Sequence, residues 1–131
     1  MGCMAALIWM PAVTKADEDT PLAKQMEAMD DAYKAFRRET DPVKGAESAR
    51  EAQLAVIKAM AETPTLVEAI SDPAEKAKAA AKYRKMLGML YVTFCDVEMA
   101  FLDNDLPKVE ELVKAVRESK KEGHGEFIEE E

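Results

Sequence analysis

The stretch YRKMLGMLYVTFCDVEMAF, residues 83–101, decides the fold of this chain. Its large apolar side chains alternate at spacings of four and three residues, at Tyr83, Leu87, Leu90, Phe94, Val97 and Phe101. This alternation is the seam of a helix in a left-handed bundle, whereas a half-buried strand would alternate every second residue. The stretch therefore predicts a long amphipathic helix with one buried face.

Capping residues and prolines mark the helix starts along the rest of the chain. The pairs concerned are Thr20-Pro21, Asp41-Pro42 and Asp72-Pro73, followed by Asp105 two residues before Pro107. A side-chain oxygen caps the first free N–H groups of a helix, and proline fits the first helical turn. We therefore predict long helices over 20–39, 42–62, 73–103 and 106–126. The connection between the second and third of these is the longest, and we expect a short helical turn in it.

Length and composition agree with one all-α domain. The chain has 131 residues, enough for one hydrophobic core, and 48% are apolar, 34% are charged and only five are glycine. Tight connections between helices force neighbours to run antiparallel. The expected architecture is an up-down-up-down antiparallel four-helix bundle.

The formal net charge of -8 limits the partners. Nucleic acid and anionic membrane surfaces would repel this chain, which shows no basic patch of useful size. No apolar run is long enough to span a membrane. A protein partner is expected to offer a basic docking surface, and the chain itself is expected to be a monomer or a weak dimer.

Residues 1–16 differ in character from everything that follows. An apolar run covers Met4 to Val13, and Ala16 with Thr14 two residues earlier resembles a signal-peptidase site. We expect an export signal to the periplasm in residues 1–16, although the basic n-region is missing, and a mature bundle in residues 17–131. The alternative is a disordered or packed N-terminal arm.

Cys3 and Cys95 are too few for a disulfide framework or a zinc site.

One end of the expected bundle collects two side chains that suit a haem iron. Met26 lies near the start of the first helix, and His124, the only histidine, lies near the end of the last. In the expected topology these positions share one end, and a thioether and an imidazole can ligate haem iron from opposite faces. Because the chain has no CxxCH motif, the haem would be of the b type, without covalent attachment.

The run MEAMDDAYKAF, residues 26–36, is similar to the first helix of the cytochrome b562 family around its axial methionine. Tyr83-Arg84 resembles the aromatic-arginine pair that opens the family's third helix, and the separation from there to His124 agrees without a gap. The resemblance covers residues 19 to about 128. It implies a periplasmic four-helix bundle that holds one haem b between Met26 and His124 and transfers electrons.

The expected haem site has further members and some departures from the family pattern. Its walls would be Leu22, Met29, Tyr83 and Leu87, with Lys120 beside a propionate. Leu87 stands where the family usually has a second aromatic residue, and Lys120 where it tends to have arginine. Each of the glycines that flank His124 costs a helix interior about 0.5 to 1 kcal/mol relative to alanine. We expect bound haem to hold this last turn in place.

Other functions find less support in the residues. The chain has no nucleophile motif with a nearby histidine, no glycine-rich phosphate loop and no Glu-x-x-His pair, so no enzyme is expected. The alternative function is a haem-free periplasmic bundle that binds a protein partner or a soft metal through its methionines. Copper at Met26, Met29 and His124 is one form of that alternative, without a dedicated motif.

Overall fold

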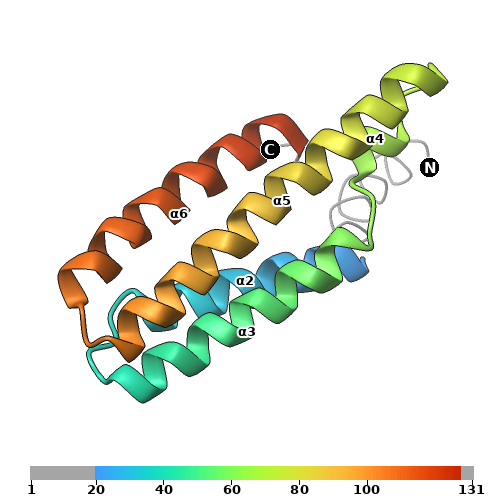
Figure 1. Cartoon of the computed structure of the whole chain (residues 1–131). Coiled ribbons are helices and arrows are strands. Elements are labelled where there is room, and N and C mark those ends of the chain that lie inside the picture. Colours follow the sequence, from blue (N-terminus) through green and yellow to red (C-terminus); the bar gives the residue numbers. More distant parts are fainter. Residues whose placement is uncertain (1–19, 128–131) are drawn as a thin grey trace, which may run out of the picture.

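The computed structural model describes residues 20–127 and contains four long helices and one short helix, with no strand in that range (Figure 1). The elements are α2 (Pro21–Phe36), α3 (Pro42–Met60), α4 (Thr65–Glu68), α5 (Pro73–Leu102) and α6 (Leu106–Phe127). The predicted all-α fold is therefore confirmed. The predicted signal segment, residues 1–16, lies outside the described residues.

The predicted helix starts are confirmed, and each carries its side-chain cap. Thr20 Oγ1 accepts a hydrogen bond from the N–H of Ala23 at 3.1 Å. The caps Asp41, Asp72 and Asp105 accept from the N–H groups three residues ahead at 2.9, 2.9 and 3.2 Å. A cap of this kind stabilises a helix by about 1 kcal/mol. Each start is thus fixed by residues adjacent in sequence.

The end of α2 differs from the prediction. The helix ends at Phe36, three residues before the expected position 39. The Glu39 carboxylate accepts hydrogen bonds from the N–H groups of Thr40 and Asp41 at 3.1 and 3.0 Å, which holds this segment in a turn.

The short helical turn expected between the second and third long helices is present as α4. The last helix continues through Gly123 and Gly125 to Phe127.

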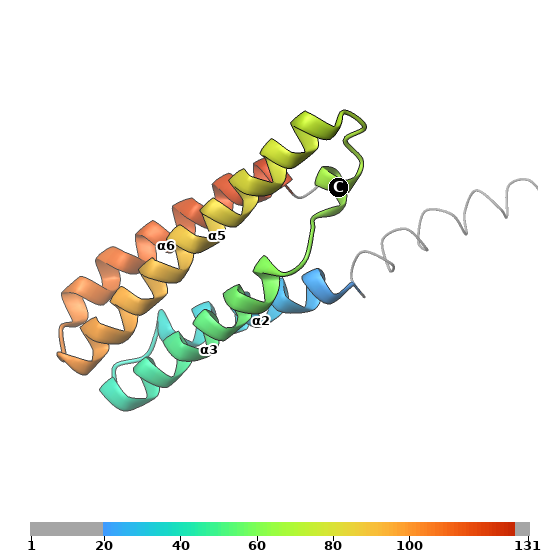
Figure 2. The ribbon, with the colours of Figure 1, turned by 45° about the vertical axis from the view of Figure 1, so that its right-hand side comes forward.

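The long helices pack in sequence order, α2 against α3, α3 against α5, and α5 against α6 (Figure 2). The start of α5 meets the end of α3, because the Tyr83 hydroxyl donates to the Ala59 carbonyl at 2.8 Å. At the other end of this pair, Gly45 near the start of α3 faces Phe101 near the end of α5. The helices α3 and α5 are therefore antiparallel. No helix of the described part is long and apolar enough to cross a membrane.

The core combines aromatic side chains from α2 and α5 with small residues from α3. The rings of Phe36 and Phe94 pack edge to face with centroids 5.9 Å apart. The inward face of α3 is largely alanine, at Ala46, Ala49, Ala52, Ala55 and Ala59. At Gly45 a Cβ atom would lie 2.3 Å from the Phe101 ring, so only glycine fits there. Small residues on α3 thus allow the close approach of α5.

Candidate functional site

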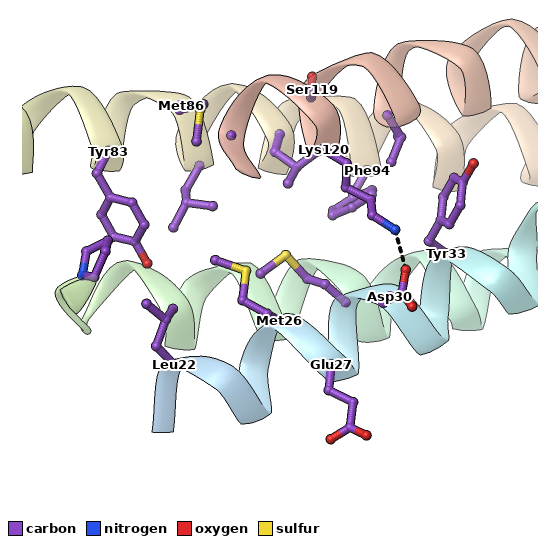
Figure 3. Close-up of a pocket in the computed structure, with 16 residues that line it drawn as sticks. Leu22, Met26, Glu27, Asp30, Tyr33, Tyr83, Met86, Phe94, Ser119 and Lys120 are labelled. Carbon is purple, nitrogen blue, oxygen red and sulfur yellow. Dashed lines mark hydrogen bonds and ion pairs between the residues drawn. The ribbon is translucent and has the colours of Figure 1, made fainter. Parts of the chain in front are cut away.

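A cavity of about 310 Å³ lies between α2, α5 and α6 (Figure 3). A volume of this size falls at the lower end of the range for small-molecule pockets, about 300 to 1,000 Å³. Six of the seven residues predicted for the site line this cavity: Leu22, Met26, Met29, Tyr83, Leu87 and Lys120. Its walls are mostly apolar, so it suits a hydrophobic ligand.

Methionine sulfur is concentrated in this cavity. Met26 and Met29 are three residues apart on α2 and therefore share one helix face. Met29 is buried and Met26 is half-buried, and a third methionine, Met86, lines the cavity from α5. Thioether sulfur is a soft ligand for haem iron or for Cu(I). The cavity therefore offers thioether ligands of the kind that both predicted functions need.

The backbone of His124 lies in α6 directly after Gly123, which lines the cavity. The side chain of His124 is outside the described part. At Gly123 a Cβ atom would lie 2.9 Å from Met86 Cε and 3.5 Å from its sulfur. Met86 therefore packs directly on the turn of α6 that carries the histidine. The predicted pair of Met26 and His124 comes from helices on two sides of the same cavity.

Tyr83 closes one end of the cavity and joins two helices. Its hydroxyl donates to Ala59 at the end of α3, and its side chain is almost fully buried. Burial raises the pKa of Tyr83 to about 12, and the Glu62 carboxylate adds to the rise. The ring is therefore neutral at physiological pH and presents an apolar surface to the cavity.

Charged side chains close the other end (Figure 3). The Lys120 ammonium forms an ion pair with Asp30, and Lys34 Nζ lies 3.0 Å from the same carboxylate. The hydrogen bond from Lys120 is the main cause that lowers the pKa of Asp30 below its usual 3.8, and burial opposes it. Lys120 also lies over the Tyr33 ring, with Nζ 5.0 Å from the centroid. Lys120, predicted to pair with a propionate, is paired here with a carboxylate of the protein itself.

Sequence reasoning missed several members of the site. Asp30 follows Met26 by one helical turn, so helical spacing alone could have placed it on the cavity side. Its pairing with Lys120, 90 residues away, has no local signal. Pro64 also lines the cavity, from the connection before α4.

The Tyr33 hydroxyl at this polar end is buried and has no hydrogen-bond partner in the described structure. Within the same part of the chain no group of three or more His, Cys, Asp or Glu side chains could hold a metal ion. An apolar cavity with thioethers, bounded by a cation, suits an apolar group that carries its own metal and acidic substituents. The lining residues therefore fit a haem better than a bare hard cation.

Comparison with known protein families gave a match over most of the chain. The family model of cytochrome b562 matches residues 21–127. This range spans all five helices and every residue predicted for the site. A search of curated proteins found no significant match. The chain therefore belongs to the cytochrome b562 family, whose members bind haem b non-covalently and carry electrons.

Proposed function

We propose that this protein is a periplasmic electron carrier that holds one haem b between Met26 and His124. The observation that supports it best is the convergence of six predicted site residues on one cavity beside the turn that carries His124. The proposal includes an up-down-up-down order of the four long helices, because this order brings the start of α2 and the end of α6 together. The antiparallel packing of α3 on α5 agrees with that order.

In this proposal the chain's residues orient the cofactor and exclude water. Met26 and His124 would bind the haem iron, and Leu22, Met29, Tyr83 and Leu87 would form the walls around the haem. Bound haem b supplies an iron that cycles between the ferric and ferrous states, and a thioether ligand favours the ferrous state. Two protein ligands leave no open position for oxygen or a substrate, which suits electron transfer rather than catalysis.

Lys120 is the proposed partner of a haem propionate. Its ammonium is already held at the edge of the cavity by Asp30 and has three N–H donors. It can therefore keep one hydrogen bond to Asp30 while it donates another to a second carboxylate. Asp30 thus acts as the residue that positions Lys120.

Location and partner complete the proposal. The apolar run of residues 4–13 before Ala16 supports export to the periplasm. The net charge of -8 favours a redox partner with a basic docking surface, because opposite charges speed the encounter.

Haemin titration of the full chain tests this function. The wild-type protein is expected to bind one haem and to give sharp α and β bands on reduction, typical of a six-coordinate iron. Met26→Ala and His124→Ala are each expected to weaken these bands. Met89→Ala is the matched control, because Met89 is an exposed methionine of the same chain outside the cavity. Unsaturable binding that neither ligand substitution alters would refute the proposal.

A soft-metal site is the second candidate, favoured by the three methionines that line the cavity, Met26, Met29 and Met86. Thioethers bind Cu(I) and its redox-inert analogue Ag(I). Calorimetric titration of the haem-free protein with Ag(I) tests this soft-metal site. Stoichiometric binding that disappears in Met26→Ala and Met29→Ala would support this site, and binding equal to that of Met89→Ala in all variants would exclude it.

A further inference from the structure

The cavity lining carries very little positive charge for a ligand with acidic groups. Among the described lining residues, the ionised side chains are those of Glu27, Asp30 and Lys120. Glu27 is exposed and points away from the cavity, whereas Asp30 and Lys120 point toward each other at its edge (Figure 3). The ion pair between these two side chains already balances the charge of the Lys120 ammonium. A ligand carboxylate that approaches Lys120 therefore also approaches the Asp30 carboxylate.

A second lysine contacts Asp30 from outside the cavity. One carboxylate oxygen, Oδ1, accepts a hydrogen bond from Lys120, and the other, Oδ2, lies 3.0 Å from Lys34 Nζ. The Lys34 side chain is 59% exposed, against 30% for Asp30, and Lys34 is not among the lining residues. Ion pairs with an exposed partner are strongly weakened by solvent. Lys34 thus offsets only a small part of the Asp30 charge at the cavity edge.

Lys120 is positioned by two contacts, and only one of them needs a negative charge. Its ammonium lies 5.0 Å from the centroid of the buried Tyr33 ring, within the range of a cation–π contact. Its other partner is an oxygen of Asp30, and an asparagine amide oxygen can accept the same hydrogen bond. The substitution Asp30→Asn therefore removes the charge while it keeps an acceptor for Lys120.

We propose that the negative charge of Asp30 weakens the binding of haem b and lowers its reduction potential. This inference rests on the proposed function, in which Lys120 receives a haem propionate. Propionates are ionised at neutral pH, so two carboxylates then share one ammonium and repel each other. Ferric haem carries one more positive charge than ferrous haem, so a nearby carboxylate favours the ferric state. Asp30 thus positions Lys120 through its oxygen and acts on haem through its charge.

Paired titrations with two porphyrins test this effect. Haemin has ionised propionates, whereas haemin dimethyl ester has the same ring and iron without those charges. Asp30→Asn is expected to tighten haemin binding by roughly tenfold, because it removes the repulsion. It is not expected to tighten binding of the ester, which has no propionate charge for Asp30 to repel. Both porphyrins are titrated into the full haem-free chain in the same mixed solvent.

Two further variants are the controls for the change in charge. Asp31→Asn removes the same charge from an exposed neighbour on α2, and Glu27→Gln removes it from the lining residue that points away from the cavity. Each is expected to change haemin binding by less than about twofold. The proposal is overturned if Asp30→Asn binds haemin no more tightly than these controls, or if it tightens binding of the ester by the same factor. Absence of sharp α and β bands in the wild-type protein would instead refute the proposed function, and this inference with it.

The reduction potential is an independent readout. Asp30→Asn should raise the midpoint potential by about 30 mV, which is an about threefold larger gain in affinity for ferrous than for ferric haem, at 59 mV per tenfold change. Asp31→Asn should shift the potential less, because its side chain lies outside the cavity lining. Spectroelectrochemical titration of the haem-bound proteins measures both values. An unchanged or lower potential in Asp30→Asn would overturn the proposed effect on the potential.

Unfolding of the haem-free protein separates this role of Asp30 from a purely structural one. Without haem, the ion pair with Lys120 stabilises the fold, so Asp30→Asn should slightly lower the urea concentration at the unfolding midpoint at neutral pH. The same substitution should increase haem affinity, so the two effects have opposite signs. A residue that only maintained the fold would lower both quantities when substituted. A decrease in both stability and haem affinity would therefore overturn the proposal.

Discussion

At the scale of single residues, two tyrosines with opposite hydrogen-bond environments predict opposite effects of the same substitution. Tyr83→Phe removes a buried hydrogen bond to Ala59, whose carbonyl keeps a second bond from the N–H of Glu62. The expected loss in the free energy of unfolding is therefore moderate, about 1 kcal/mol. Tyr33→Phe removes a buried hydroxyl that has no partner, so stability should stay equal or rise. Urea unfolding of both variants measures the difference, and an equal loss in both would contradict this account.

The Asp30 carboxylate predicts how stability depends on pH. Because its pKa is lowered in the folded protein, its contribution is present above the unfolded value near 3.8 and is lost as the pH falls through the lower folded value. Partial exposure of Asp30 and Lys120 keeps the effect small. Below pH 4 the wild type should lose stability more steeply than Asp30→Asn. Chemical unfolding across this pH range measures the slopes, with Asp31→Asn, an exposed neighbour, as the control. Parallel curves for wild type and Asp30→Asn would contradict the prediction.

At the scale of the elements, the last turn of α6 carries two glycines, which weaken a helix, beside His124, the proposed haem ligand. A Cβ atom at Gly125 would meet nothing within 4 Å, so Gly125→Ala should stabilise this turn by about 0.5 to 1 kcal/mol. Gly123→Ala should gain less, because Met86 must move away from the new methyl group. Amide hydrogen exchange of the turn in the haem-free protein measures both effects.

The same measurement with and without haem tests whether the cofactor holds the turn. Haem is expected to increase protection of the amides around His124 in the wild type, and to add less in Gly125→Ala. Equal protection in the haem-free and haem-bound wild type would contradict this role of the cofactor.

The helix starts were predictable because each depends on residues close together in the sequence. The end of α2 was not predictable from such local residues. Asp41 and Asp72 cap their helices through N–H groups three residues ahead, so neighbouring residues contain the whole interaction. The end of α2 depends on the Glu39 side chain folding back on Thr40 and Asp41, which competes with continued helix and has no periodic pattern.

In the candidate site too, residues that share a helix face were predictable, whereas contacts between different helices were not. Helical spacing together with the family resemblance was enough to bring Met26, Met29 and Leu87 to one cavity. The contact of Met86 with Gly123 and the ion pair of Asp30 with Lys120 join different helices, so they depend on how the helices pack. Spacing within one helix carries no information on such contacts. The fold class and the apolar walls of the cavity were therefore predictable. The ion pair of Asp30 with Lys120 at the polar end of the cavity was not.

At the scale of the whole molecule, the net charge of -8 acts on every small redox reagent that approaches the haem. A cationic oxidant such as hexaammineruthenium(III) is attracted, so its rate of electron exchange with the reduced haem protein should fall as salt is added. An anionic oxidant such as ferricyanide is repelled, and its rate should rise. Stopped-flow kinetics over a range of ionic strength measures both slopes, and each reagent is the control for the other. Slopes of the same sign would mean that charge near the haem, rather than the field of the whole chain, governs the encounter. Opposite slopes would instead support a basic partner, because the field that attracts the cationic reagent would also attract a basic docking surface.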